Sequence, residues 1–220
     1  MTTNNNNLIR GCIFDLDGVV VDTARYHYLA WNRLAQDLGF EFTVEHNERL
    51  KGVSRMASLD ILLEIGGISL PVEEKQRLAA IKNEWYVDYI SKMTPDEILP
   101  GVMLFLEQLK HNQIRIALGT ASKNAAMILQ QIGLEKTFDC IIDGNLVTRA
   151  KPDPEVFLKA AAGLGLSPAL CVVFEDAIAG VEAAHRGGMH CIGVGQPGIL
   201  SKADKVIPGF VGANINLLSF

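Results

Sequence analysis

Short apolar runs alternate with helical patterns along this chain, and the alternation constrains its fold more than any other feature. Five apolar runs are predicted to be strands: Ile9–Phe14, Ile114–Leu118, Cys140–Ile142, Cys171–Phe174 and Cys191–Val194. Apolar spacing of i, i+3 and i+4 predicts helices over Val102–His111, Asn124–Ile132, Pro154–Leu164 and Ala177–Arg186. Apolar strands that alternate with helices indicate an α/β fold, with a Rossmann-like parallel sheet covered on both faces.

One long stretch, from Thr23 to about Met93, interrupts the alternation. It contains no convincing strand, and helical patterns dominate it, over Ala24–Leu38, Ser54–Glu64 and Val72–Ser91. A stretch this long does not suit a crossover loop in a compact domain. We therefore expect an inserted helical cap domain, residues 23–93, and a catalytic core formed by residues 1–22 and 94–220.

Composition and charge exclude several classes of protein. Apolar residues make up 49% of the 220 residues, which is enough for a globular core and rules out a wholly disordered chain. Because the net charge is −5, nothing favours a nucleic-acid or anionic-membrane partner. The apolar runs are too short to span a bilayer, and the polar segment Met1–Asn7 resembles a frayed tail rather than a signal peptide. We expect a cytoplasmic monomer.

The four cysteines, Cys12, Cys140, Cys171 and Cys191, do not form a C-x-x-C pair, so the sequence does not support a zinc site. Each lies in a short apolar run, where a free cysteine packs as a small buried hydrophobe. We expect buried thiols rather than a catalytic nucleophile.

Polar residues follow the predicted strands at the point where each strand ends. They are Asp15, Asp17, Thr120, Ser122, Lys123, Asn124, Glu175 and Asp176. Ligands of open parallel sheets bind at the carboxyl ends of the strands, so these side chains are expected at one edge. Lys151 precedes a predicted helix in an irregular stretch and is expected at the same edge.

Four carboxylates at one site predict a bound cation, because like charges at close range raise one another's pKa. Mg²⁺ accepts carboxylate ligands and leaves a coordination position for a phosphate oxygen. Lys151 and the amides of the helix after Thr120 would hold the rest of the phosphate charge. This combination is typical of phosphoryl transfer, in which a carboxylate can also be the covalent acceptor.

Each motif also has a purely structural interpretation. Asp22-Thr23 is predicted to cap the helix that starts at Ala24, and Glu175-Asp176 would likewise cap the helix at Ala177. Together, however, the carboxylates, the hydroxyl and the lysine occur in order at four strand ends or loops, which favours a site.

In this set of motifs the chain resembles the haloacid dehalogenase superfamily, from Ile9 to Val194. Asp15-Leu-Asp17-Gly-Val is similar to its first motif, Thr120 to the second, Lys151 to the third and Glu175-Asp176 to the fourth. The helical insertion resembles the cap of subfamily I. The resemblance implies that Asp15 is the nucleophile and Asp17 the general acid/base. It also implies that the Mg²⁺ ligands are Asp15, Asp17 (through its backbone carbonyl), Glu175 and Asp176, and that the transferred phosphoryl group is held by Thr120, Ala121 and Lys151.

Three further segments are similar to sugar-phosphate mutases of that superfamily: Asp22–Trp31, Asn47–Arg55 and Thr120–Asn124. This resemblance implies interconversion of β-D-glucose 1-phosphate and glucose 6-phosphate through a bisphosphorylated sugar. The implied ligands of the second phosphate are Arg55, Ser122, Lys123 and Asn124. His27 and Lys82 would couple cap closure to Asp17, and the implied sugar site is lined by Trp31, Lys51, Gly52, Val53 and Ser58.

The cap residues have plainer interpretations as well. Thr23, His27 and Trp31 share one helix face, which would also suit a buried aromatic residue beside a satisfied histidine. The segment from Lys51 to Arg55 would suit an exposed loop before a helix.

Two other functions stay open beside the mutase. A sugar-phosphate phosphatase would use the same residues with water as the acceptor, although the two basic residues Arg55 and Lys123 favour a second phosphate site and hence the mutase. A non-catalytic sugar-phosphate sensor is disfavoured because the catalytic carboxylates are present. A dehalogenase is disfavoured because Asp17 is present.

Overall fold

The sheet has six strands, all parallel, and the predicted α/β class is confirmed. A computed structural model describes residues 9–220, so the tail predicted at Met1–Asn7 lies outside the described residues. The strands are β1 (Gly11–Phe14), β2 (Arg115–Gly119), β3 (Cys140–Ile142), β4 (Cys171–Glu175), β5 (His190–Val194) and β6 (Lys205–Ile207). Their order is β3-β2-β1-β4-β5-β6. β1 therefore lies between β2 and β4, and the ends of these three strands meet.

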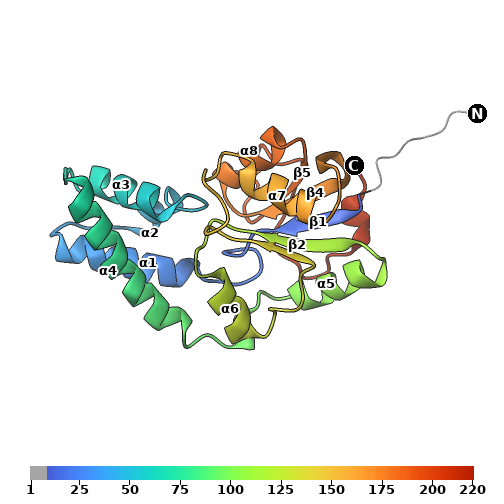
Figure 1. Cartoon of the computed structure of the whole chain (residues 1–220), viewed down its shortest axis with the longest axis horizontal. Coiled ribbons are helices and arrows are strands. Elements are labelled where there is room, and N and C mark those ends of the chain that lie inside the picture. The colour runs from blue at the N-terminus through green and yellow to red at the C-terminus, as the bar shows by residue number, and fades with distance from the viewer. Residues whose placement is uncertain (1–8) are drawn as a thin grey trace, which may run out of the picture.

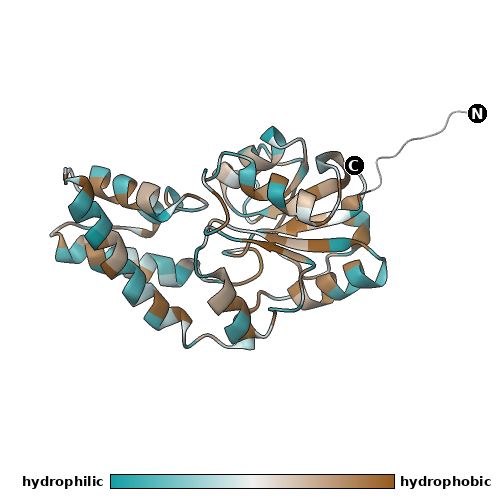
Figure 2. Cartoon of the chain, in the orientation of Figure 1, coloured by the Kyte–Doolittle hydropathy of each residue, from teal (hydrophilic) through white to brown (hydrophobic). Residues whose placement is uncertain are grey.

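Helices cover both faces of the sheet (Figure 1). α5 (Val102–His111) and α6 (Ala125–Ile132) lie on one face, and α7 (Glu155–Gly163) and α8 (Ile178–Arg186) on the other. Successive residues of a strand point to opposite faces, so Phe14 packs in the α5–α6 core and Ile13 in the α7–α8 core. The strands are accordingly apolar along their length, as Figure 2 shows.

The first four of the five α-helices between β1 and β2 form a separate layer, called here the insert (residues 24–90). They are α1 (Ala24–Asp37), α2 (Val44–Glu48), α3 (Arg55–Ile65) and α4 (Val72–Ile90). The apolar faces of α1, α3 and α4 share a core of their own that includes Trp31, Leu34, Leu59 and Leu62. The insert lies beyond the carboxyl ends of the strands (Figure 1).

The chain enters and leaves the insert through two segments that lie side by side. The Leu99 amide donates to the Val20 carbonyl at 2.9 Å, and Val21 forms an antiparallel bridge with Ile98. Directly before Ile98, the chain forms the 3-10 helix η1 (Pro95–Glu97). Its Glu97 accepts hydrogen bonds from Arg25 at 2.7 Å and from the Tyr26 hydroxyl at 2.8 Å.

One strand and one α-helix were not predicted from the sequence. β6 has three residues, one of them a lysine, and this gives almost no strand signal. α2 has five residues and is stabilised locally, since Thr43 and His46 form a reciprocal capping box at its start. Short 3-10 turns, η2 (Pro168–Leu170) and η3 (Ile215–Leu218), complete the described elements.

The cysteines are free thiols, as expected from the sequence. Cys12, Cys171 and Cys191 are buried and Cys140 is half-buried. Burial raises the pKa of all four thiols, which disfavours the nucleophilic thiolate.

Among the described residues, we find no helix with the length and apolar content needed to cross a membrane.

Candidate active site

The carboxyl ends of β1, β2 and β4 bring the predicted core residues together. Asp15 directly follows β1, Thr120 directly follows β2, and Glu175 ends β4. Lys151, from the segment before α7, reaches into this group and donates to Asp15 Oδ1 at 2.5 Å and to Glu175 Oε2 at 3.0 Å. Lys151 is 3% exposed and Glu175 is 0% exposed, so this network is shielded from water.

The buried charges shift one another's ionisation. Burial by itself lowers the pKa of Lys151, but the carboxylates of Asp15 and Glu175 outweigh that effect and raise it. Burial raises the pKa of Glu175 well above its ordinary value, and it raises the pKa of Asp176 to about 7 with help from the Asp15 charge. The group therefore holds more negative charge than Lys151 balances.

Three carboxylates of this group suit a hard cation. Oxygens of Asp15, Glu175 and Asp176 all lie within 4.8 Å of one another. The donors are oxygen only, and their raised pKa values reflect a repulsion that a divalent cation would relieve. Gly180 makes room for this arrangement, because a Cβ there would lie 2.0 Å from the Glu175 carboxyl carbon.

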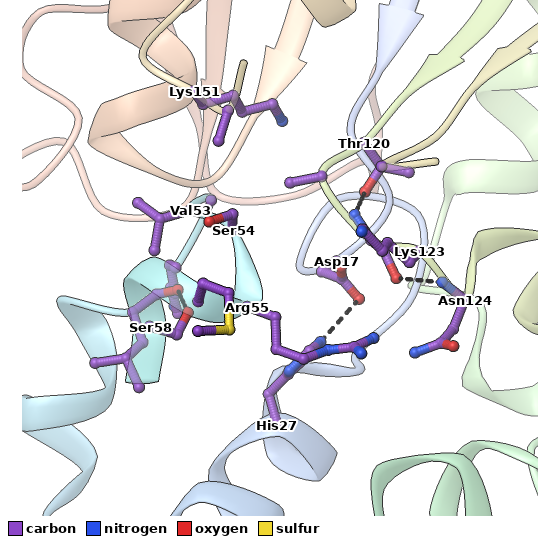
Figure 3. A pocket seen from close by; sticks show the side chains of 18 of the residues that line it. Asp17, His27, Val53, Ser54, Arg55, Ser58, Thr120, Lys123, Asn124 and Lys151 are labelled. Carbon is purple, nitrogen blue, oxygen red and sulfur yellow. Dashed lines mark hydrogen bonds and ion pairs between the residues drawn. The ribbon is translucent and has the colours of Figure 1, made fainter. Parts of the chain in front are cut away.

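Asp17 lies between this acidic group and the insert. Its backbone amide donates to Asp15 Oδ2 at 3.0 Å, and its carboxylate points toward His27 (Figure 3). Asp17 Oδ1 is 4.0 Å from His27 Nε2. Burial, and next the Asp15 charge, raise the pKa of Asp17 to about 6, although the hydroxyl of Thr23 donates to it and acts in the opposite direction.

The prediction that Asp22-Thr23 caps α1 is wrong for the side chain. Thr23 occupies the N-cap position, but its side chain makes no capping hydrogen bond. Its hydroxyl donates to Asp17 Oδ1 instead. The hydroxyl thus donates to a carboxylate six residues earlier in the chain, which the fold of the intervening segment brings close, and it accepts no capping hydrogen bond from an α1 amide. The structural interpretation of Glu175-Asp176 as a cap is wrong as well, because α8 has no side-chain capping hydrogen bond. Glu175 Oε1 accepts instead from the amide of Ala177, the N-cap residue, at 3.3 Å.

A buried lysine lies on the insert side of the cavity. Lys82 of α4 is 2% exposed, and its Nζ is 3.0 Å from His27 Nδ1. The same nitrogen lies 4.4 Å from the Trp31 ring centroid and 4.7 Å from that of Tyr86. Burial, and then the charge of Arg55, lower the pKa of Lys82 to about 7. Burial, and then the Lys82 charge, lower the pKa of His27 well below its ordinary value.

A second group of cations and amides faces the same space. Arg55 begins α3, whose first turn is capped by the Ser54 hydroxyl, which accepts from the Ala57 amide at 3.3 Å. Lys123 and Asn124 belong to the loop after β2, called here the phosphate loop (residues 120–124). Two local hydrogen bonds shape it, from the Ser122 amide to Thr120 Oγ1 at 3.1 Å and from the Asn124 amide to Ser122 Oγ at 3.3 Å. Arg55 approaches this loop from the insert (Figure 3).

These groups line one cavity of about 450 Å³ between the insert and the sheet. Its lining includes every site residue predicted from the sequence except Glu175. Glu175 lies behind the wall, where it pairs with Lys151. Residues 51–55 precede or begin α3 and line the cavity, and all five are half-buried, so the interpretation of this segment as an exposed loop is wrong.

The sequence profile described as haloacid dehalogenase-like hydrolase matches residues 9–188. The chain belongs to the haloacid dehalogenase-like hydrolase family. It is an enzyme of that family.

Two mutases are among its most similar relatives. β-Phosphoglucomutase of Bacillus subtilis (strain 168) is 44% identical over 201 residues, which cover 90% of this chain and 89% of that protein. The crystal structure of a β-phosphoglucomutase from Clostridium difficile matches with a TM-score of 0.91 and 43% identity, covering 96% of each chain. A phosphorylated carbohydrates phosphatase of Thermotoga maritima is 35% identical over 183 residues, 82% of each chain.

Several cavity residues of this haloacid dehalogenase-like enzyme were missed from the sequence. On α4 the lining residues are Gln76, Ala79, Ala80, Asn83 and Tyr86, together with Lys82. Their spacing is that of one helical stripe, but small and polar residues in such a stripe also suit a solvated face. Tyr86 is fully buried, and within residues 9–220 its hydroxyl has no hydrogen-bond partner.

Proposed function

We propose that this enzyme is a β-phosphoglucomutase, which interconverts β-D-glucose 1-phosphate and glucose 6-phosphate through a phosphorylated Asp15 and glucose 1,6-bisphosphate. The observation that carries the proposal is the presence, in one cavity, of two sets of side chains whose chemistry suits phosphate. Lys151 and Thr120 lie at the core end, and Arg55, Lys123 and Asn124 at the other. The similarity to two β-phosphoglucomutases supports the same conclusion.

In this proposal Asp15 accepts the phosphoryl group. The Asp17 amide and Lys151 each hold one oxygen of the Asp15 carboxylate, so the carboxylate is oriented before the substrate binds. A carboxylate oxygen attacks phosphorus, and the bond between phosphorus and the sugar oxygen breaks. Lys151, Thr120 and Ala121 hold the phosphoryl group during the transfer.

Asp17 moves the proton. In its protonated form it gives the proton to the departing sugar oxygen. In the reverse direction it takes the proton from the sugar hydroxyl that attacks phosphorylated Asp15. A pKa of about 6 suits both roles, because both protonation states are accessible near neutral pH. The bisphosphate would then turn end for end, so that each phosphate in turn faces Asp15.

The acidic group fits Mg²⁺, which we propose as the cofactor. Asp15, Glu175 and Asp176 would hold it through carboxylate oxygens and Asp17 through its backbone carbonyl. When bound, it would neutralise charge on the phosphoryl group.

A thermal melt tests the metal site. Added Mg²⁺ is expected to raise the melting temperature, because a ligand that binds only the folded state stabilises it. Asp176→Asn should abolish the rise, while Asp60→Asn, on the exposed face of α3, should retain it. A rise that persists in Asp176→Asn would contradict the proposed ligands.

The insert would act as a cap over the sugar. We propose that the chain divides functionally near residues 22 and 93, with His27 and Lys82 joining Asp17 when the cap closes. The sugar would lie against Trp31, Lys51, Gly52, Val53 and Ser58, and closure would exclude water from phosphorylated Asp15.

The deciding experiment supplies β-D-glucose 1-phosphate, Mg²⁺ and a trace of glucose 1,6-bisphosphate, and follows glucose 6-phosphate and free phosphate together. Rapid formation of glucose 6-phosphate with little free phosphate is the expected result. The second candidate is a sugar-phosphate phosphatase, which the similarity to the Thermotoga maritima enzyme favours. Free phosphate as the main product would establish that candidate and refute the mutase.

A further inference from the structure

A hydrogen bond joins the insert directly to the phosphate loop. Asn124 Nδ2 donates to Asn83 Oδ1 at 3.0 Å. Asn83 lies on α4 and Asn124 precedes α6, so the contact crosses from the insert to the core. Both side chains are half-buried and both line the cavity. Asn83 lies outside the sequence motifs that predict the site.

The core holds the backbone of the phosphate loop without help from the insert. The Gly144 amide donates to the Ser122 carbonyl at 3.0 Å, and Asn145 Nδ2 donates to the Lys123 carbonyl at 3.0 Å. The fit is close, because a Cβ at Gly144 would lie 2.3 Å from the Ala121 carbonyl oxygen. None of these contacts holds the side-chain carboxamide of Asn124. The hydrogen bond to Asn83 of the insert holds it instead.

A phosphate oxygen only accepts hydrogen bonds, so a carboxamide binds it only through its NH₂ group. Asn83 Oδ1 also accepts, and it therefore selects the orientation in which the NH₂ group of Asn124 faces the cavity. One N–H binds Asn83 and the other remains for the phosphate. Nearby, Arg55 and Lys123 supply positive charge for the phosphate. Because Asn83 is neutral, it orients Asn124 without placing a negative charge beside that phosphate.

We propose that Asn83 is a positioning residue for the distal phosphate, meaning the substrate phosphate at the Arg55 and Lys123 end of the cavity. Asn83 aligns the Asn124 carboxamide only when the insert is seated against the core. This inference rests on the proposed function, because it needs a substrate with a phosphate at that end. It links cap closure to the presence of the second phosphate. A substrate without a distal phosphate gains nothing from the contact.

The first test compares Asn83→Ala on two substrates. For the mutase reaction, KM for β-D-glucose 1-phosphate and for glucose 1,6-bisphosphate is expected to rise about tenfold, the effect of one hydrogen bond to a charged group. Hydrolysis of p-nitrophenyl phosphate, which carries no distal phosphate, should change less than about twofold. Asn32→Ala, the same truncation at a half-buried position of α1, is the matched control and should behave as wild type. Equal losses on both substrates would overturn the proposal.

An isosteric change tests the charge argument. Asn83→Asp retains an acceptor for Asn124 but places a negative charge beside the distal phosphate. Its KM for the bisphosphate is expected to exceed that of Asn83→Ala, with p-nitrophenyl phosphate hydrolysis unchanged. A KM equal to that of wild type would mean that Asn83 lies away from the phosphate and would overturn the proposal.

A double-mutant cycle separates positioning from direct binding. If Asn83 acts through Asn124, Asn83→Ala should add less than about twofold in an Asn124→Ala background. Additive losses would mean that Asn83 binds phosphate by itself, which would overturn the positioning role. The two proposals fail differently. A wild-type enzyme that makes no glucose 6-phosphate refutes the mutase, whereas active wild type with an unaffected Asn83→Ala refutes only the role of Asn83.

Discussion

The two ends of the cavity are built from opposite charges. At the core end lie three carboxylates, of which Asp15 and Glu175 pair with the buried Lys151, while Asp176 lies 3.7 Å from the Lys51 Nζ. At the insert end, Arg55, Lys82 and Lys123 face the cavity, and no carboxylate of residues 9–220 forms an ion pair with any of the three. The core end therefore carries excess negative charge and suits a cation, and the insert end carries unpaired positive charge and suits an anion.

The same contrast appears in two buried lysines. Lys151 is 3% exposed and Lys82 is 2% exposed. Neighbouring carboxylates raise the pKa of Lys151, whereas burial and the charge of Arg55 lower the pKa of Lys82 to about 7. Burial disfavours the charged form of both lysines, so the neighbours decide the direction of the shift. Lys151 is the counterion of two buried carboxylates, whereas Lys82 forms no ion pair among the described residues.

The largest effect is expected at the core end, from Asp15→Asn. An amide is too poor a nucleophile to accept the phosphoryl group, so mutase activity should fall roughly 10⁴-fold or more. Mass spectrometry of the protein after incubation with glucose 1,6-bisphosphate checks for the added phosphate. Asp153→Asn, at a carboxylate outside the cavity lining of residues 9–220, is the control and should still be phosphorylated. A covalent phosphate on Asp15→Asn would refute the assignment.

Lys151→Met tests whether the core end depends on its internal cation. Removing one partner of a buried ion pair leaves uncompensated charge, so the free energy of unfolding in EDTA should fall by about 3–5 kcal/mol. Urea unfolding measures this change. The matched control is Lys159→Met, which removes the i,i+4 pair with Glu155 on α7 and should cost less than about 1 kcal/mol. Similar losses in the two variants would contradict the contrast.

Arg55→Ala tests the need of the insert end for an anion. We expect kcat/KM for the mutase reaction to fall about 100-fold, because a guanidinium forms strong paired hydrogen bonds to phosphate. Hydrolysis of p-nitrophenyl phosphate should fall less than about threefold. Arg49→Ala, which removes an exposed pair with Glu64, is the control in the same part of the insert. If both reactions fall equally, Arg55 does not serve a second phosphate.

The smallest effect is expected from Lys82→Met, and its sign is opposite to that of Lys151→Met. The pKa of Lys82 is about 7 in the folded protein, and that of a lysine in the unfolded chain is about 10.4, so the unfolded state binds more protons between these values. Stability of the wild type therefore rises with pH over this window, and the penalty from Lys82 is complete below about pH 7. Lys82→Met should stabilise the protein by about 2 kcal/mol at pH 6.

The pH dependence of the stability gained in Lys82→Met separates the effect of charge from the effect of packing. It should shrink as the pH rises from 6 to 9, since the folded wild type loses its buried charge in that range. Urea unfolding at both pH values, without substrate, measures it. A gain that does not vary with pH would attribute the effect to packing alone, and a loss of stability would refute the unpaired-charge interpretation.

Residues with local sequence signals lie where the sequence predicts them. Asp15, Asp17, Thr120 and Glu175 follow or end apolar strands, and a parallel sheet brings strand ends together whatever the details of packing. Asn83 and Tyr86 carry no such signal, because a helical stripe looks alike whether it faces a cavity or solvent. β6 was missed for a related reason, since three residues do not establish a period.

The order of apolar and polar residues along the chain was enough to predict the parallel sheet, the helical insertion and the carboxylates at the strand ends. These properties depend on periodicity and on position relative to a strand end, and both are local. Three others came only from the tertiary structure: the turn of the Thr23 hydroxyl to Asp17, the opposite pKa shifts of Lys82 and Lys151, and the contact between Asn83 and Asn124. Each depends on how the chain folds back on itself. The two pKa shifts and the Asn83–Asn124 contact arise where segments distant in sequence meet. Thr23 and Asp17 are only six residues apart, but they meet because the chain turns between them.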